Sequence, residues 1–294
     1  MSGRRWMTAE LCAIAAVVGG VWVSAQQAPL PYGPPRAFGD SITGAFEGWF
    51  DNKDGSRNFL VGYMNRNLKQ SQDVPIGPNN RIEPGGPDMG QPTHFKPARQ
   101  TGMFIVTVPK GFAPDQKLTW TITINGQTTQ IPLRSKLDYN VNPFSDVAVG
   151  NTPPRLRLVE NATPIQGPVA TLANAPSVTA TVNTQVTLTA WVDDDGKYSS
   201  GSNAPVRDGR SPVEVSWSKY RGAGQVTFSS QKAELKVAKG GGVDQPFSAI
   251  GTTTVKFSAP GEYALLAVAN DYSGEGGNGE VCCWTNAYLK VTVK

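Results

Sequence analysis

The stretch Gln185–Val192, which reads QVTLTAWV, decides the fold class. Apolar residues recur at every second position from Val186 to Val192, which is typical of a β-strand with one buried face. Leu118–Ile124, LTWTITI, repeats the pattern with threonines at the intervening positions. No segment has the apolar spacing of an amphipathic helix of any length, so the sequence predicts an all-β protein.

The first half of the chain predicts a β-sandwich domain over residues 41–150. Two aromatic-rich runs flank an Asp-Gly turn, which favours a hairpin, and an Asn-Gly turn follows the strand Leu118–Ile124. The other strands expected here are Thr43–Asp51, Arg57–Asn65, Gly102–Val108 and Thr128–Leu133. Between them, the proline-rich stretch Lys69–Gln100 fits neither a helix nor a strand. Such a stretch either serves a function or covers a sheet face or edge, and both interpretations remain open.

The second half predicts another β-domain over residues 176–294, preceded by a linker and first strand over 151–175. Its further strands are expected at Val213–Trp217, Thr253–Phe257, Tyr263–Ala269 and Ala287–Val293. The fold class expected for the whole chain is therefore two β-sandwich domains in tandem.

The second half resembles the immunoglobulin-like domains, of the PKD and REJ-related kind, that recur in exported bacterial proteins. The stretches that carry the resemblance are VTLTAWVDDDG, VEVSWSKYRGAGQVTFS, TTTVKFSAPGEYALLAVAND and AYLKVTV. The resemblance implies an immunoglobulin-like sandwich with Trp217 in its core and Tyr263 at a corner where its hydroxyl bonds to the main chain. Insertions at Gly196–Ser211 and Ser229–Gly251 depart from the pattern, so interaction sites there cannot be carried over. Such modules mostly space, bind or adhere, so the resemblance implies a fold more than a function.

The first half, around FEGWFDNKDG and GQPTHFKPARQ, is similar to uncharacterised secreted bacterial proteins. This similarity implies export and brings no activity with it.

The N-terminus has the three-part pattern of a secretory signal peptide, expected over residues 1–25. Two arginines precede an apolar run, Leu11–Val23, which ends at Ser24-Ala25 before a polar, proline-rich leader over 26–40. The apolar run is shorter than the roughly 20 residues that cross a bilayer, so we expect no membrane-spanning segment. The protein is expected to be exported, to a periplasm or to the cell exterior.

Charge and cysteine content narrow the function classes. The formal net charge of +4 is small and not gathered in a basic block, so nucleic acid is not an expected partner. After the signal peptide only Cys282 and Cys283 remain, which excludes a disulfide framework. Three outcomes compete for this pair: a strained ring between the neighbours, two free thiols, or bridges to other chains. We favour the ring, because an exported protein meets an oxidising compartment.

The stretch Phe38–Gly44, FGDSITG, looks like the nucleophile block of GDSL-type esterases, with Ser41 as the nucleophile. Such an esterase needs a late Asp-x-x-His to supply the base, and the only histidine is His94, preceded by Gln-Pro-Thr. The segment before Gly39 is proline-rich and does not predict a buried parallel strand. We therefore predict no catalytic residue.

Acidic residues follow two of the expected strands in the second half. Asp193, Asp194 and Asp195 close one strand and Asp271 closes another, and loops after strands B and F of an immunoglobulin topology emerge at the same end. Convergent carboxylates favour calcium, whereas three acidic residues before a glycine also make an ordinary solvated turn. We expect either no cofactor or calcium bound at these four residues.

Aromatic residues and the lone histidine are the candidate ligand-binding residues. Trp191 is out of phase with the inward residues of its strand, so it should face outward near Tyr272 and Trp284, where aromatic rings stack on sugars or on a partner protein. The same rings can instead pack beneath the inserted loops. His94 lies in a cationic cluster with Lys96 and Arg99, which either meets an acidic ligand group or serves a structural role.

Together these patterns predict a secreted, non-catalytic binding or adhesion module. Its ligand would be a carbohydrate or an envelope protein, with calcium as a possible aid to binding. Two other hypotheses stay open: a structural spacer or subunit of an envelope assembly, and a hydrolase that uses Ser41 or His94.

Overall fold

The computed structural model describes residues 36–146, 150–197, 211–240, 245–271 and 282–294. These residues fall within one compact unit, Pro35–Lys294. Their regular structure is almost entirely β, with one 3-10 turn at Leu137–Tyr139, so the predicted all-β class is confirmed. None of the helices in the described part of the chain has the length and apolar character to span a membrane. The predicted signal peptide and most of the leader lie outside the described residues.

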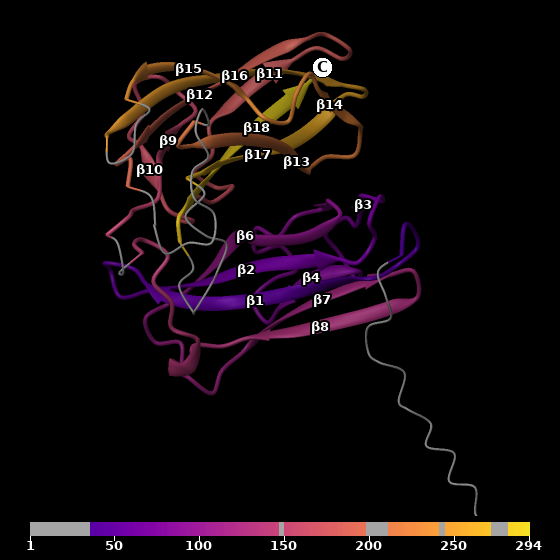
Figure 1. Ribbon diagram of the computed structural model, residues 1–294. Helices are drawn as coiled ribbons and strands as arrows, with labels where there is room; N and C mark the ends of the chain where they lie inside the picture. The colour runs from indigo at the N-terminus through magenta and orange to yellow at the C-terminus, as the bar shows by residue number, and fades with distance from the viewer. Residues whose placement is uncertain (1–35, 147–149, 198–210, 241–244, 272–281) are drawn as a thin grey trace, which may run out of the picture. The chain divides into compact units, whose positions relative to one another are not determined.

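The N-terminal half, residues 36–146, forms two main antiparallel sheets that face each other (Figure 1). The predicted hairpin is present, since β1 and β2 pair from Asp51 and Arg57 at the turn to Ile42 and Asn65 at the far end. The first sheet has the order β1-β2-β6 and contains β1 (Ile42–Asp51), β2 (Arg57–Asn65) and β6 (Ala98–Val108). The second has the order β4-β7-β8 and contains β4 (Asn80–Glu83), β7 (Leu118–Ile124) and β8 (Gln127–Leu133). Aromatic side chains fill the space between them; Phe104 meets Trp120 edge to face, with ring centroids 5.2 Å apart.

The proline-rich stretch Lys69–Gln100 is more regular than its sequence indicates. It supplies the short pair β3 (Gln72–Asp73) and β5 (His94–Phe95), and also β4, which extends the second sheet. The fully buried side chain of Asn80 holds this stretch in place through its hydrogen bonds. Its Nδ2 donates to the carbonyl oxygens of Val74 and Pro92 at 2.9 and 2.8 Å, and its Oδ1 accepts from Trp120 Nε1 at 2.9 Å. One amide thus joins three distant segments.

The C-terminal half, residues 150–294, is an immunoglobulin-like sandwich of two sheets. The outer sheet has the order β10-β9-β12-β16-β14, with β15 also paired to β16. Its strands are β9 (Arg155–Arg157), β10 (Ile165–Gln166), β12 (Val186–Asp194), β14 (Val226–Phe228), β15 (Glu234–Lys239) and β16 (Phe247–Phe257). The inner sheet has the order β11-β18-β17-β13 and contains β11 (Ser177–Ala180), β13 (Glu214–Arg221), β17 (Gly261–Asn270) and β18 (Trp284–Val293).

Two hallmarks of the immunoglobulin-like fold are confirmed. Trp217 on β13 is 1% exposed in the core between the two sheets. The hydroxyl of Tyr263 donates to the carbonyl oxygen of Ala259 at 2.8 Å, which is the expected tyrosine corner. Strand β12 also behaves as its alternation predicts, with Leu188, Ala190 and Val192 buried in the same core.

The inner sheet is buried on both faces, which the sequence analysis did not anticipate. On β17, Leu265 and Ala267 pack in the immunoglobulin-like core, whereas Ala264 and Leu266 belong to the same cluster as the N-terminal aromatic residues. Tyr220 of β13 and Tyr288 of β18 join that second cluster. Burial on both faces explains why Tyr263–Ala269 is a continuous apolar run instead of an alternating one.

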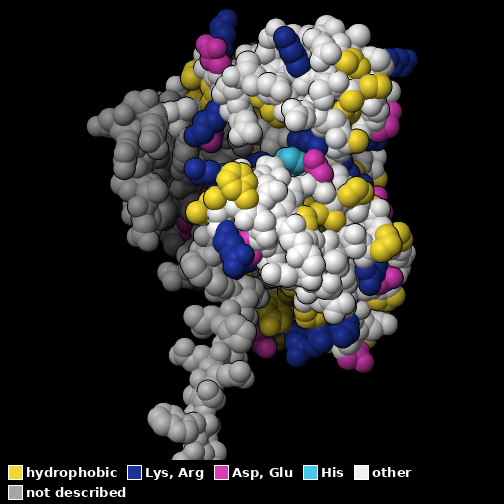
Figure 2. All heavy atoms as spheres, turned by 90° about the vertical axis from the view of Figure 1, so that its right-hand side faces the viewer, with side chains coloured by type: hydrophobic (Ala, Val, Ile, Leu, Met, Phe, Trp, Pro, Cys, Tyr) yellow, Lys and Arg dark blue, Asp and Glu magenta, His cyan; other side chains and the backbone are white. Residues whose placement is uncertain are grey.

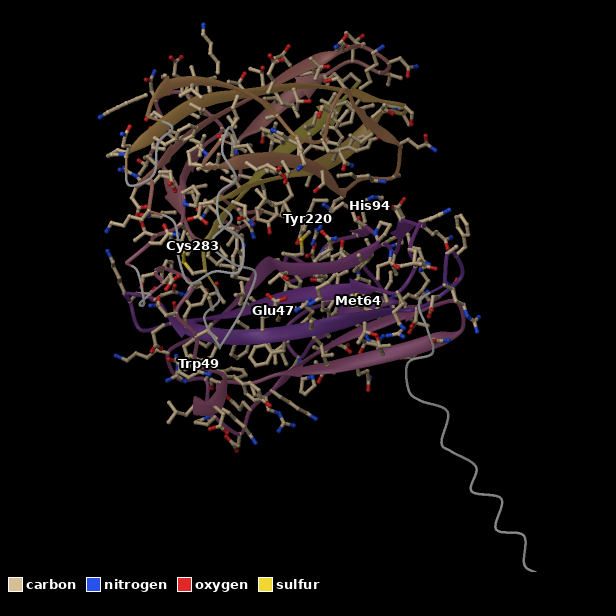
Figure 3. All side chains as sticks on the ribbon, in the orientation of Figure 1. Glu47, Trp49, Met64, His94, Tyr220 and Cys283 are labelled. Carbon is tan, nitrogen blue, oxygen red and sulfur yellow. A yellow bond between two sulfur atoms is a disulfide. The ribbon has the colours of Figure 1, made fainter. Side chains whose placement is uncertain are left out.

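Hydrogen bonds and ion pairs fix β13 and β18 to the N-terminal half. The hydroxyl of Tyr288 donates to the carbonyl oxygen of Met103 at 2.6 Å, and Lys219 Nζ lies 3.1 Å from Asp73 Oδ1. His94, the cyan side chain in Figure 2, also contacts Asp73, with 2.7 Å between Nδ1 and Oδ1. Tyr220 and His94 come from facing elements in Figure 3. The immunoglobulin-like sandwich is therefore anchored along one sheet, which leaves its outer sheet and strand ends as candidate binding surfaces.

Candidate functional site

A cleft of about 430 Å³ lies where the end of β12 meets the start of β16 and the short strands β9 and β10. We call it the Asp cleft. Its lining residues are Thr152, Pro153, Arg155, Gln166, Asp193, Asp194, Asp195, Lys239, Pro246, Phe247 and Ser248. It brings together all three consecutive aspartates of the sequence, two basic side chains and several hydrogen-bonding groups. The cleft can therefore bind a polar ligand through donors and acceptors of both signs.

Asp193 and Asp195 are held by hydrogen bonds within the walls of the cleft. Asp193 accepts from Ser248 Oγ at 2.6 Å, and its other oxygen lies 3.5 Å from Arg157 Nη2. Asp195 accepts from the amide and the hydroxyl of Thr152, at 3.1 and 2.8 Å. These bonds fix the end of β12 to β16 and to the segment that enters the C-terminal half, so the cleft is preformed.

Asp194 differs from its two neighbours because it points into the protein. Its side chain is 7% exposed, and Oδ2 accepts from the amide of Gly196 at 2.8 Å. The other oxygen, Oδ1, is inaccessible to solvent and has no hydrogen-bond partner among the described residues. Burial raises the pKa of Asp194 to about 7, and the negative charges of Asp271 and Asp195 add to the increase.

Asp271 directly follows β17 and is fully buried. Its Oδ2 accepts from Asn151 Nδ2 at 2.8 Å. Asn151 is also fully buried, and its Oδ1 lacks a donor among the residues that the structure describes. The sequence analysis missed Asn151, because an asparagine after a glycine is an ordinary turn signal. The ends of β12 and β17 thus carry two buried carboxylates, and the buried amide of Asn151 is bonded to the carboxylate of Asp271.

Cys282 and Cys283 lie against this cluster. Both are buried, and their sulfur atoms are bonded to each other. The Sγ of Cys283 is 3.8 Å from the carbonyl oxygen of Asn151. The pair therefore forms part of the packing that excludes water from Asn151.

The three aromatic candidates lie in different environments. Trp191 is half-buried on the outer face of β12, where Arg157 and Ile250 are its neighbours on adjacent strands. Trp284 is 5% exposed and packs in a cluster with Phe50, so its ring does not present a face to solvent. Tyr272 lies outside the described residues.

The side chain of His94 is already paired with an acidic side chain of this protein. Its imidazole is 16% exposed and pairs with Asp73, which also receives the ammonium group of the buried Lys219. Arg99, from the same predicted cationic cluster, pairs with Glu47 at 2.6 Å. Both basic side chains therefore meet acidic groups of this chain.

Ser41 is buried, with 4% of its surface exposed. Its hydroxyl lies 3.5 Å from Asp40 Oδ1, whereas the imidazole of His94 is bonded to Asp73. A buried hydroxyl without a base is not placed to attack a substrate.

The side chains that most often bind metal ions in proteins are those of His, Cys, Asp and Glu. No group of three or more such side chains lies close enough to hold a metal ion within the described ranges. In this region the side-chain amide of Asn151 contacts the carboxylate of Asp271 through the hydrogen bond from Nδ2 to Oδ2 at 2.8 Å.

Comparisons with known proteins do not identify a function for the Asp cleft. No family model and no curated protein matches the sequence. Among solved structures, domains 4 and 5 of the S-layer protein SbsC are 12% identical over 60% of this chain and 65% of theirs, with a TM-score of 0.22. A fragment of titin is 9% identical over 85% of this chain and 98% of the fragment, with a TM-score of 0.23. Cadherin-like domains 1 to 4 of zebrafish RET are 10% identical over 76% of this chain and 45% of theirs, with a TM-score of 0.24.

The chain spans 65% of the S-layer fragment and less than half of the RET fragment. Likenesses with TM-scores this low carry no argument about function, so the functional argument depends on this chain's own side chains.

Proposed function

We propose that the protein is an exported, non-catalytic binding or adhesion module whose ligand, a carbohydrate or a polar protein segment, occupies the Asp cleft. The observation that carries this proposal is the cleft itself, with its two hydrogen-bonded aspartates and its two basic side chains on rigid strand ends. Binding sites on loops and strand ends of a rigid scaffold are the usual arrangement in immunoglobulin-like modules.

The wider setting belongs to the same proposal. The predicted signal peptide favours export to a periplasm or to the cell exterior. The resemblance of residues 176–294 to the PKD and REJ-related kind favours a module that binds or adheres. The burial of Ser41 and the internal pairing of His94 favour a role without covalent chemistry.

A glycan array probed with the purified mature protein tests the ligand class. We expect binding that Lys239→Ala weakens, because Lys239 lines the cleft near its acidic wall. Lys236→Ala is the matched control, since Lys236 lies on the same strand and does not line the cleft. If both variants bind like the wild type, the ligand does not occupy the Asp cleft.

A structural subunit of an envelope assembly is the second candidate, and one surface favours it. Leu137, Tyr139 and Phe144 are 82%, 49% and 39% exposed on one short segment of the N-terminal half. Exposed apolar side chains this close together are typical of protein contacts. This candidate predicts that Leu137→Ser leaves the melting temperature unchanged but abolishes a cross-linked complex in whole cells.

A further inference from the structure

The two basic side chains of the Asp cleft lie at opposite ends of one row across the outer sheet. Arg155 on β9 is opposite Asp193 on β12. On the other side of Asp193, Ser248 on β16 and then Lys239 on β15 continue the row (Figure 1). Side chains opposite one another in antiparallel strands share one face of the sheet. All four line the cleft, so a cation lies on either side of its acidic centre.

The aspartates of the cleft are bonded within the protein or shielded from a ligand. Asp193 accepts from a serine hydroxyl at 2.6 Å. Both oxygen atoms of Asp195 accept hydrogen bonds, from two backbone amides and a threonine hydroxyl, at distances between 2.8 and 3.1 Å. Asp194 is 7% exposed, and its unbonded oxygen is inaccessible to solvent. A ligand that enters the cleft therefore meets carboxylates that are already bonded or out of reach.

The two cations of the row, in contrast, remain available to a ligand. Arg155 and Lys239 are exposed, and their side chains have no ion pair or hydrogen bond within the described part of the chain. A guanidinium group presents N–H donors in a plane that matches a carboxylate or a similar anion, and an ammonium group adds a point charge. Although three aspartates line the cleft, its available charged groups thus favour an anionic ligand.

The spacing of the two cations favours a ligand with more than one anionic group. Three strand spacings of about 4.8 Å separate β9 from β15, which amounts to about 14 Å between the two backbones. Side chains stand roughly perpendicular to a sheet, so Arg155 and Lys239 do not converge on one small anion. A chain that carries an anionic group on several of its units can bind both.

An aromatic ring adjoins the cleft on the same face of the sheet. Trp191 precedes Asp193 by two residues, so it occupies the next outward position of β12, about 7 Å further along the strand. It is half-buried, and Ile250, its neighbour on β16, is 38% exposed. The open part of an indole ring provides a flat apolar surface on which a sugar ring can stack. The ring therefore favours a carbohydrate over an acidic peptide.

We propose that the ligand of the Asp cleft is an acidic polysaccharide. Its anionic groups, carboxylate or sulfate, bind Arg155 and Lys239, and a sugar ring just outside the cleft stacks on Trp191. This inference rests on the proposed function, because it names the ligand class of the same cleft. Salt screens the attraction between exposed charges, so the affinity should fall as the ionic strength rises.

Calorimetric titration of matched acidic and neutral oligosaccharides into the mature protein tests the ligand class. One pair is an oligomer of galacturonic acid and its methyl ester, and the other is a sulfated oligosaccharide and its unsulfated form. We expect the acidic form of at least one pair to bind about tenfold or more tightly than its neutral form. This comparison uses the wild-type protein alone, so it does not depend on any variant, and the two pairs distinguish a carboxylate from a sulfate.

Three variants then place the acidic ligand in the cleft. Arg155→Ala and Lys239→Ala should each weaken its binding about three- to tenfold, because each removes one charged contact. Lys236→Ala is the matched control, since it removes an equal charge from β15 outside the cleft and should change the affinity by less than about twofold. All three side chains are exposed, so we expect unchanged melting temperatures.

Two results separate this inference from the proposed function. If the acidic and neutral forms bind equally and Lys239→Ala weakens both, the ligand class is wrong and the cleft is still the binding site. If the acidic form binds more tightly but neither Arg155→Ala nor Lys239→Ala weakens it, both proposals fail, because the ligand lies elsewhere.

Two further results would overturn the ligand class alone. The first is no binding of any of these oligosaccharides, since the glycan array tests the cleft with other carbohydrates. The second is polyglutamate that binds as tightly as the acidic oligosaccharides and is unaffected by Trp191→Ala, which would indicate an acidic peptide as the ligand.

Discussion

Replacing Gly102 by alanine should destabilise the protein strongly, because it disturbs the contact between β6 and β18. Gly102 has a φ of +54°, and a Cβ atom built on it would lie 2.0 Å from Cζ2 of Trp284. The indole cannot easily move, since it is 5% exposed in a cluster with Phe50, Leu60 and Ile105.

The magnitude follows from two separate costs. A positive φ costs an alanine roughly 1 to 2 kcal/mol relative to glycine. Overpacking of a buried site costs about 1 to 3 kcal/mol. We therefore expect Gly102→Ala to lower the free energy of unfolding by about 2 to 5 kcal/mol, a large part of the 5 to 15 kcal/mol typical of folded domains.

Urea unfolding, followed by tryptophan fluorescence and by circular dichroism, measures this loss. Two glycine variants separate the costs. Gly39→Ala also has a positive φ, +77°, but no heavy atom within 4 Å of the new Cβ, so it should lose only about 1 to 2 kcal/mol. Gly111→Ala has neither problem and should change the stability by no more than about 0.5 kcal/mol. If Gly102→Ala loses no more than Gly39→Ala, the tight contact with Trp284 is refuted.

Two more predictions concern single side chains. Tyr263→Phe removes the hydroxyl bonded to Ala259, and we expect urea unfolding to show a loss of about 1 kcal/mol; an unchanged midpoint would mean that the corner bond adds nothing. Although its partial burial acts in the opposite direction, the bonds from His94 and Lys219 hold the pKa of Asp73 below its ordinary value. A depressed pKa in the folded state stabilises the protein above the unfolded pKa, near 4, and this contribution is lost as the pH falls through the lower folded value. Asp73→Asn should therefore melt below the wild type at pH 7, with the difference shrinking below about pH 4, and a pH-independent difference would contradict this linkage.

The sequence predicted best those elements whose pattern lies within a short stretch of the chain, such as an alternation of apolar residues or a turn. Strand β7 has the bounds predicted from its alternation, and β12 buries Leu188, Ala190 and Val192, three of the four residues that the period of two selects. The corner at Tyr263 follows from a short local stretch, Pro260–Tyr263, that resembles immunoglobulin-like domains. In each case the information lies within about ten residues of chain, which a pattern can capture.

Other features depend on partners far away in the sequence. The stretch Lys69–Gln100 acquires its order from Asn80, whose amide bonds distant backbone groups, and no local pattern shows that. The burial of β17 on both faces was also missed, although the unbroken apolar run Tyr263–Ala269 is typical of such a strand.

The candidate site was predicted only in part. The sequence identified the acidic strand ends, and the structure separates Asp193 and Asp195, which bond to neighbouring hydroxyl and amide groups, from the buried Asp194. Alternation along β12 explains this difference between adjacent residues. The place of Asn151 in the cluster depends on a contact across 120 residues with Asp271, so no local signal could reveal it.

Hydrogen exchange in the presence of a bound glycan tests most directly whether the Asp cleft is the working surface of this protein. The probe is the glycan that binds most tightly on the array, added to the mature protein. We expect slower amide exchange at Thr152, Arg155, residues 193–195 and residues 247–248, which line the cleft, and unchanged exchange over residues 137–144. Protection confined to 137–144, or anywhere else away from the cleft, would contradict the account.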